Sequence, residues 1–307
     1  MTKLAAIVSR DYRFNFVRWR SWAFAVSAAA LLASAALLAT RGLDYGIDFK
    51  GGLLVEVRSE AGFDIEELRG RLSSAADEIS LQSADADGKS VLISALDKSE
   101  DEQAIAGTLA SIKASLGDNV EYRRVEMVGP RVGEELKSDS GLAAFFAILV
   151  IVLYVWFRFE WQFALGALVS LFHDALITLG LLSLCGVAFD LTTVAAVLTL
   201  IGYSINDTVV EYDRMRENLR KHRRESVDTL INRSINDCVA RTLLTGITTL
   251  AAAAILLVVG GDALYSFSFV LFFGILIGTY SSVYIAMPML SLFDIKKTVE
   301  AKEREAA

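Results

Sequence analysis

Four ionisable side chains lie inside long apolar stretches of this sequence, where a charge is costly. They are His173, Asp174, Asp207 and Arg241. A charged group at the centre of a bilayer costs about 2.5–3.5 kcal/mol on insertion scales, so such residues usually face a protein or water-filled interior and mark ion pathways. The chemistry that they could support is proton transfer, because a carboxyl or an imidazole can bind and release a proton whereas an arginine keeps its charge.

Asp207 and Arg241 form a candidate pair. Asp207 lies four residues from Glu211, and Arg241 lies four residues from Asp237, in two consecutive apolar runs. At 1.5 Å per residue, each lies about 6 Å inside its flanking charge, so their depths match. An Asp beside an Arg can take a proton if the Arg moves away or water enters. The spacing predicts a proton relay; the alternatives are a static ion pair that locks two helices, or two side chains that reach the headgroups.

His173 and Asp174 are adjacent, so on a helix they point about 100° apart, and we expect that they cannot serve one site equally. His173 suits proton transfer near neutral pH, but a packing hydrogen bond to a Ser or Thr is an equal alternative. Further polar residues near the charged positions are Ser204, Asn206, Thr245 and Thr249. The cysteines lie at no metal-ligand spacing, and neither a phosphate loop nor a nucleophile–base pair occurs. The sequence therefore predicts no enzyme, no metal site and no cofactor.

The apolar stretches that hold these residues predict membrane spans. Hydrophobic residues make up 54% of the 307-residue chain, and the mean hydropathy is +0.45. A helix needs about 20 apolar residues to cross a bilayer. We predict six transmembrane helices, at 21–40, 140–157, 163–185, 191–211, 238–259 and 265–290.

The basic residues set the orientation of these spans. Every Lys and Arg except Arg241 lies outside the spans or at their edges, and the short links with Lys and Arg all fall on one side. The positive-inside rule then places the N-terminal segment 1–20 and the tail 294–307 in the cytoplasm, and 41–139 on the opposite side. Segment 41–139 is acidic and carries no basic stripe, so nucleic-acid binding is not expected.

Segment 41–139 is long enough to form a small domain. Its patterns predict strands at 53–58, 79–83, 91–96 and 120–128, and helices at 64–79, with Asp64 as N-cap, and 101–116. This order is βαββαβ, the ferredoxin-like pattern. The predicted fold class is an α-helical integral membrane protein with six transmembrane helices and one small ferredoxin-like α+β domain outside the cytoplasm.

Four motifs resemble the SecD/SecF family of protein-export membrane proteins, in its SecF branch, within the resistance-nodulation-division superfamily. They are YGIDFKGG at 45–52, VGPRVGEEL at 128–136, IGYSINDTVVEYDRMREN at 201–218 and RTLLTGITTL at 241–250. The resemblance covers nearly the whole chain, in order. It implies a multi-pass protein of the bacterial plasma (inner) membrane, with the ferredoxin-like domain in the periplasm.

The resemblance also implies a function. Members pair with a SecD subunit, associate with the SecYEG channel and its accessory subunits, and use the proton motive force to promote translocation and release of an emerging preprotein after the ATP-driven SecA step. The acid and the Arg implicated in proton conduction in that family correspond to Asp207 and Arg241 here. Sodium is not excluded, because a carboxylate near Ser, Thr and Asn oxygens could serve either ion.

The motif residues that flank segment 41–139 are our predicted joints for its movement. They are Gly46, Asp48, Gly51, Gly52, Gly129, Pro130 and Gly133. Two other functions stay open. A stand-alone exporter of lipids or small molecules is disfavoured by the single small external domain, and a structural subunit would use Asp207 and Arg241 only to hold helices together.

Overall fold

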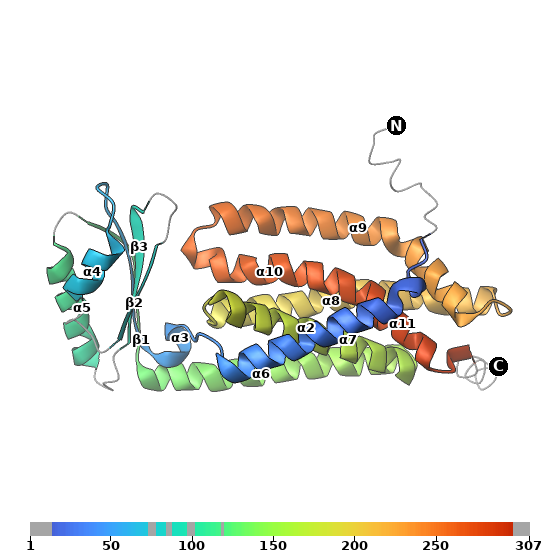
Figure 1. Ribbon diagram of the computed structural model, residues 1–307. Coiled ribbons are helices and arrows are strands. Elements are labelled where there is room, and N and C mark those ends of the chain that lie inside the picture. Colours follow the sequence, from blue (N-terminus) through green and yellow to red (C-terminus); the bar gives the residue numbers. More distant parts are fainter. Residues whose placement is uncertain (1–13, 73–77, 84–87, 97–101, 118–119, 297–307) are drawn as a thin grey trace.

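The computed structural model describes residues 14–72, 78–83, 88–96, 102–117 and 120–296. Parts of the predicted terminal segments, 1–13 and 297–307, lie outside the described residues. Figure 1 shows a bundle of long, roughly aligned helices, with a small sheet domain (residues 52–128) across one end of it. The predicted fold class is confirmed by this architecture.

Six helical segments in the described residues are long and apolar enough to cross a membrane. The first five are α2 (Arg20–Thr40), preceded by the 3-10 turn η1 (Val17–Trp19), α6 (Pro130–Arg158), α7 (Trp161–Cys185), α8 (Leu191–Lys221) and α9 (Val227–Val259). The sixth runs through α10 (Asp262–Ser281), the π-helical turn η2 (Ser282–Ala286), α11 (Met287–Met289) and the 3-10 turn η3 (Leu290–Leu292).

Several of these helices extend beyond the predicted apolar runs. Helix α6 begins at Pro130 rather than at 140, because Pro is well suited to the first turn of a helix. Helix α8 continues to Lys221 rather than ending at 211, and α9 begins at Val227 rather than at 238. Polar pairs hold the two extensions together, since Arg214 Nε donates to Asp237 Oδ2 at 2.7 Å. A run of apolar residues predicts only the part of a helix that lies in the lipid, so the prediction misses polar extensions of the same helix.

The π-helical turn η2 interrupts the sixth span just before Pro288. Proline cannot donate a backbone hydrogen bond and crowds the preceding turn, and a π-turn absorbs one additional residue. Ser281 and Ser282, where this turn begins, are both fully buried. The turn therefore places two adjacent hydroxyls in the interior of the bundle.

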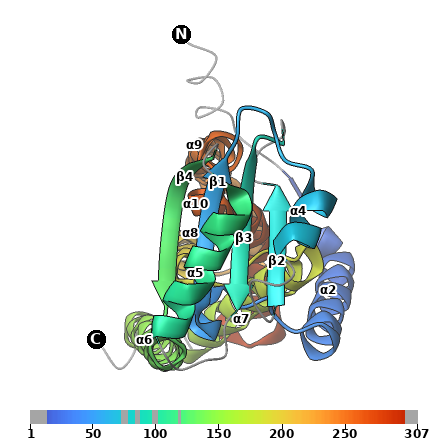
Figure 2. The same ribbon diagram turned by 90° about the vertical axis from the view of Figure 1, so that its left-hand side faces the viewer.

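The sheet domain has four strands and two helices in the order βαββαβ. Its elements are β1 (Gly52–Arg58), α4 (Ile65–Leu72), β2 (Glu78–Ser83), β3 (Ser90–Leu96), α5 (Glu102–Leu116) and β4 (Glu121–Val128). The antiparallel sheet has the order β2-β3-β1-β4, and Figure 2 shows α4 and α5 on the face turned away from the bundle. This is the ferredoxin-like arrangement.

Alternation along β1 explains which face of the sheet is covered. Leu53, Val55 and Val57 are fully buried against the helices, whereas Leu54 and Glu56 face the bundle side. Asp64 caps α4 as predicted, since its Oδ1 accepts from the backbone N–H of Glu66 at 2.9 Å. The predicted extension of this helix to 79 is wrong, because 78–83 pair with β3 as a strand.

Candidate functional site

A network of polar side chains, all buried except the half-buried Tyr280, lies where α2, α7, α8 and the sixth span meet. We call it the dyad network, and it consists of Ser27, His173, Asp174, Ser204, Tyr280 and Ser281. Asp174 is fully buried, and His173 is only 2% exposed. Small residues make room for this crossing, because a Cβ at Gly278 would lie 3.1 Å from that of Ser204.

Asp174 is the acceptor at the centre of the dyad network. Its Oδ2 accepts from the hydroxyls of Ser204, at 2.6 Å, and Ser281, at 2.8 Å. Its Oδ1 lies 2.9 Å from Nδ1 of His173. His173 and Asp174, which we expected not to serve one site equally, are therefore in direct contact. Although their Cβ atoms diverge, the imidazole reaches back to the neighbouring carboxylate.

His173 also meets the expectation of a hydrogen bond to a Ser. Its Nε2 lies 3.1 Å from Oγ of Ser27 on α2, and its ring stacks on Tyr280 at 6.1 Å between centroids. The contact joins helices that are distant in sequence, so the dyad network fastens α2 to α7 and to the sixth span. Ser204 was predicted near the charged positions, whereas Ser27, Tyr280 and Ser281 were not predicted.

Asp207 lies one turn along α8 from Ser204 and is 3% exposed. Its Oδ2 is buried and has no hydrogen-bond partner among the described residues. The next turn of α8 carries Glu211, which is 1% exposed and also has an unpartnered oxygen, Oε2, in the described part of the chain. Glu211 lines a largely apolar cavity of about 520 Å³, together with Thr242 and Gly246 of α9. Helix α8 thus carries two buried carboxyl groups that each have an oxygen without a hydrogen-bond partner in the part of the chain that the structure describes.

Sequence reasoning treated Glu211 only as a charge that flanks a span. Because α8 continues to Lys221, Glu211 lies within the helix, on the face that it buries. A signal for this was present, since Ser204, Thr208, Glu211 and Met215 follow helical spacing and all are buried. If this helical spacing had been followed past the predicted end of the span, it would have identified Glu211 as a residue on the buried face.

Arg241 is exposed on α9 and makes no ion pair with Asp207 within the described residues. The neighbouring Thr242 is buried instead, and adjacent helical positions point about 100° apart. Thr245 and Thr249 are half-buried, and their hydroxyls donate to backbone carbonyls one turn earlier, Thr245 to Arg241 at 3.0 Å. Asn206 is exposed on α8. In this chain the predicted relay residues therefore lie on neighbouring helices without touching.

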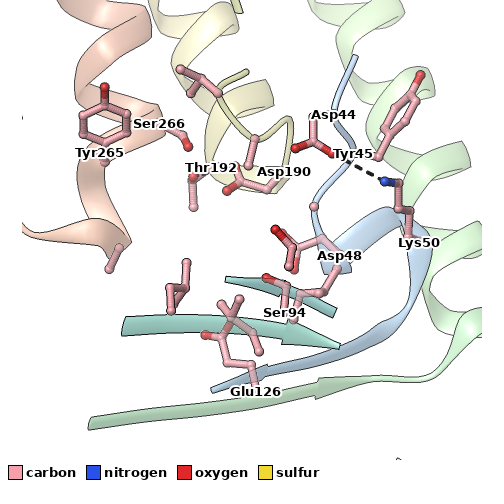
Figure 3. Close-up of a pocket in the computed structure, with 18 of the residues that line it drawn as sticks. Asp44, Tyr45, Asp48, Lys50, Ser94, Glu126, Asp190, Thr192, Tyr265 and Ser266 are labelled. Carbon is pink, nitrogen blue, oxygen red and sulfur yellow. Dashed lines mark hydrogen bonds and ion pairs between the residues drawn. The ribbon is translucent and has the colours of Figure 1, made fainter. Parts of the chain in front are cut away.

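Two of the predicted joint residues, Gly46 and Asp48, line a second cavity, of about 660 Å³, between the sheet domain and the bundle (Figure 3). Acidic side chains line it from both sides: Asp44, Asp48 and Asp190 from the bundle side and Glu126 from the sheet. Lys50 forms an ion pair with Asp44 at 3.4 Å. The cavity is therefore polar and acidic at this end of the bundle.

The short helix α3 (Ile47–Lys50) docks the sheet domain onto the bundle. Gly46 N–H donates to the carbonyl of Phe189 at 2.9 Å, and the N–H of Leu191 donates to Asp48 Oδ2 at 3.0 Å. A Cβ at Gly46 would lie 3.1 Å from that of Asp190. The predicted residues Gly46 and Asp48 thus fix α3 against the link between α7 and α8.

The remaining joint residues bring the two connections of the sheet domain together. Gly51 has φ +75°, and a Cβ there would lie 2.8 Å from Pro130 Cα. A Cβ at Gly133 would lie 3.1 Å from the backbone nitrogen of Gly51. Gly52 pairs with Val128 in the sheet, and Gly129 precedes α6 as its N-cap. The glycines permit a close contact between α3 and the start of α6.

Residues 108–296 match the family described as "Protein export membrane protein SecD/SecF, C-terminal", and residues 36–62 match the "SecD/SecF GG Motif". The chain is 42% identical to protein translocase subunit SecF of Rickettsia felis over 92% of this chain and 93% of that protein. It is 40% identical to the subunit of Rickettsia typhi, over 94% and 95%.

Among solved structures, the chain is similar to SecDF, a translocon-associated membrane protein from Thermus thermophilus. The TM-score is 0.80 at 33% identity, over 95% of this chain. A second SecDF structure, in a super-membrane-facing form, gives a TM-score of 0.69 at 34% identity. This chain spans only 39% of the length of the first SecDF chain and 41% of the second.

Proposed function

Since the chain belongs to the SecD/SecF family of protein-export membrane proteins, we propose that it is an accessory subunit of the Sec protein translocase. It promotes translocation of proteins across the bacterial plasma membrane, and their release, after the ATP-driven SecA step, and the proton motive force drives this work. Its similarity to SecF subunits over nearly their full length supports this role.

The partner of this chain is a SecD subunit. The longer SecDF chain has more than half of its length outside the match, and a separate SecD subunit would supply that part. Polar residues on the outside of the bundle support a protein partner: Asn206 is exposed on α8 and Arg241 is exposed on α9. Lipid cannot satisfy such groups, so a partner helix that covers them is favoured. Through this pair the chain acts beside the SecYEG channel and its accessory subunits.

Asp207 is the observation that carries the proton-driven mechanism. A buried carboxyl with a fixed ionic partner holds one protonation state, whereas one with a free oxygen can exchange its proton as its surroundings change. Arg241, on the neighbouring helix, is the cation whose approach would favour the ionised form. One charge that crosses a potential of 100 mV releases about 2.3 kcal/mol, enough to shift a conformational equilibrium.

Movement of the sheet domain is the step that uses this energy. The domain lies outside the cytoplasm and contacts the emerging preprotein, and the chain termini lie in the cytoplasm. Gly51 and Pro130 form the joint about which it moves, because both connections of the domain meet there. The dyad network links α2, which leads to α3, to the helix that carries Asp207.

The substitution Asp207→Asn tests the relay. It removes the exchangeable proton and keeps the size of the side chain, so we expect proton-driven stimulation of export to be lost while assembly with SecD is kept. Export is measured in membrane vesicles with an imposed pH gradient, and a sodium gradient in parallel identifies the coupling ion.

Asp213→Asn is the matched control, because Asp213 is a half-exposed acid of the same helix that pairs with Arg158. It should export like the wild type. Normal stimulation in Asp207→Asn would exclude the relay, whereas loss of assembly with SecD would favour a structural pair.

A further inference from the structure

The apolar cavity that Glu211 lines, of about 520 Å³, lies between α9, the sixth span and the segment before α2. Its volume falls within the range of about 300–1,000 Å³ that is usual for small-molecule sites. Apolar side chains line it from α9, among them Leu243 and Ile247, and from the sixth span, among them Leu276 and Val283. A cavity with these walls suits the apolar part of a small molecule.

Four aromatic rings form one continuous wall of this cavity. Phe14 and Tyr284 lie on either side of Phe16, each with its ring centroid 6.0 Å from that of Phe16. Tyr280 continues the row, with its centroid 5.4 Å from that of Tyr284, and all four residues line the cavity. The face of an aromatic ring attracts an organic cation that lies within about 6 Å of its centroid. This wall therefore favours a ligand with a positive charge.

Two side-chain amides of α9 hold the aromatic wall in place. Asn236 Oδ1 accepts from the backbone N–H of Phe14 at 2.9 Å, and Asn236 Nδ2 donates to the carbonyl of Phe14 at 2.8 Å. One turn earlier, Asn232 Oδ1 accepts from the N–H of Val17 at 3.0 Å. These bonds fasten the segment before α2 to α9, so the cavity is formed before a ligand enters it.

Glu211 is the single acid among the described residues that line the cavity, and no Lys or Arg lies among them. Its side chain is 1% exposed, and its Oε2 has no hydrogen-bond partner in the described part of the chain. Thr279, which also lines the cavity, has a buried Oγ1 that likewise lacks a partner there. A buried polar group without a hydrogen bond is costly. A ligand with hydrogen-bond donors would remove this cost.

The lining groups determine the chemical class of that ligand. A fatty acid would bring a second acid to Glu211, and a plain hydrocarbon would leave the carboxyl group unpaired. A metal ion needs several oxygen ligands, and the described residues contain no group of acids, His or Cys that could hold one. An amine supplies both N–H donors and a charge. It can arrive protonated at a carboxylate or take the proton of a carboxylic acid, and both routes give the same neutral ammonium–carboxylate pair.

We propose that this cavity is a binding site for an apolar molecule that carries an amine. The amine pairs with Glu211, and the apolar part packs between the aromatic wall and α9. The proposal rests on the cavity and its lining residues, and it does not depend on a proton relay at Asp207.

Photo-crosslinking in bilayers tests the site. The full-length chain and its SecD partner are reconstituted in phosphatidylcholine and phosphatidylglycerol, and the probe is dodecylamine with a diazirine in its alkyl chain. We expect labels on α9 between Val239 and Leu250, and labelling about tenfold weaker in Glu211→Gln, which cannot form the ion pair. Dodecanol and dodecanoic acid with the same diazirine should label these positions weakly. Equal labelling by the amine and the alcohol, or no label on this stretch, would overturn the proposal.

Gly246→Leu gives a second test that leaves Glu211 unchanged. Gly246 lines the cavity, and an added Cβ would meet only Thr279 Oγ1, at 3.8 Å, so the larger side chain has room to fill the cavity. We expect labelling by the amine to fall in this variant as well. Unchanged labelling would show that the probe binds elsewhere and would contradict the proposal.

Glu217→Gln is the matched control for both variants, because Glu217 is a half-exposed acid of α8 that does not line the cavity. It should be labelled like the wild type, and thermal unfolding checks that each variant is folded. Phosphatidylethanolamine added to the bilayer identifies the source of the amine. Competition with the probe indicates a lipid headgroup, and its absence indicates a free amine.

Discussion

Two carboxyl groups one turn apart distinguish α8 from an ordinary transmembrane helix. Asp207 and Glu211 are both buried, and each has an oxygen without a hydrogen-bond partner in the described part of the chain. Such groups reduce stability, because burial removes water and nothing replaces it. A cost in stability of this kind is retained when function requires it, as the proposed proton relay would. The two residues are therefore best regarded as one acidic segment of the helix.

Glu211→Gln should distinguish a role of Glu211 in proton-driven export from a role in the stability of the fold. The substitution removes a buried ionisable group, so we expect the free energy of unfolding to stay equal or rise by about 1 kcal/mol, while proton-driven export falls. Thermal unfolding in detergent and export in vesicles measure the two effects. Glu217→Gln, which changes a half-exposed acid of the same helix paired with Lys221, should alter neither measurement. A large loss of stability in Glu211→Gln would instead indicate a structural role.

The sequence identified the rare charges of the interior but not their contacts. Asp174, Asp207 and Arg241 stand out because charge is scarce in apolar runs. Which side chains meet depends on helix rotation and crossing, and these follow from packing against distant segments. For that reason the bond from His173 to Ser27, separated by 146 positions, could not be predicted, and Glu211 was hidden by the underestimated length of α8.

At the scale of helices, close contacts between spans rest on small residues. Gly180 of α7 lies directly against Ser34 of α2, and an added Cβ would lie 2.7 Å from the Cα of Ser34. Without a hydrophobic driving force between helices in lipid, such backbone approach is a main source of association. This contact lies on the same pair of helices that the dyad network joins, so packing and hydrogen bonding act together on α2.

Gly180→Ala tests this contact. The methyl group overlaps Ser34, so we expect a loss of about 1–3 kcal/mol in the free energy of unfolding. The matched control is Gly202→Ala in α8, where an added Cβ meets nothing within 4 Å. That variant should be neutral or slightly more stable, because Ala is the better helix former. Thermal unfolding measures the stability of the two variants. Equal stabilities would contradict a close contact between α2 and α7.

Element types were predictable, whereas several ends were not. Apolar length indicated six spans, and alternation indicated the strands, because both patterns are local. Helix α6 begins earlier than predicted, since Pro130 starts it through geometry rather than apolarity. The π-turn before Pro288 was not anticipated, because it depends on how the last span packs around Ser281 and Ser282.

On the scale of the whole molecule, the joint at Gly51 connects the sheet domain to the bundle. Gly51→Ala forces a side chain into positive φ and also against Pro130. Gly117→Ala is the control, because its φ of +77° carries the same strain but an added Cβ meets nothing within 4 Å. We expect Gly51→Ala to lose more stability, and more export, than Gly117→Ala. Equal effects would indicate that backbone strain alone matters there.

The orientation of the chain is tested by cysteine labelling in a background without Cys185 and Cys238. Ala110, on the exposed side of α5, and His222, between α8 and α9, lie at opposite ends of the molecule. We expect Ala110→Cys to react with an impermeant reagent in intact spheroplasts and His222→Cys to react only after lysis. The reverse pattern would overturn the proposed topology.

The place where the sheet domain is attached has a mechanical consequence. Both connections leave from one end of neighbouring strands, since Gly52 of β1 pairs with Val128 of β4, and the strand order puts β2 at the opposite margin. Strands lie about 4.8 Å apart, so β2 lies roughly 10 Å from β1. In the proposed movement of the domain, β1 and β4 lie at the pivot and β2 lies farthest from it. A rotation of the domain about an axis along β1 and β4 would move β2 farther than any other strand. A force applied to β2 would therefore exert the greatest torque on the start of α6.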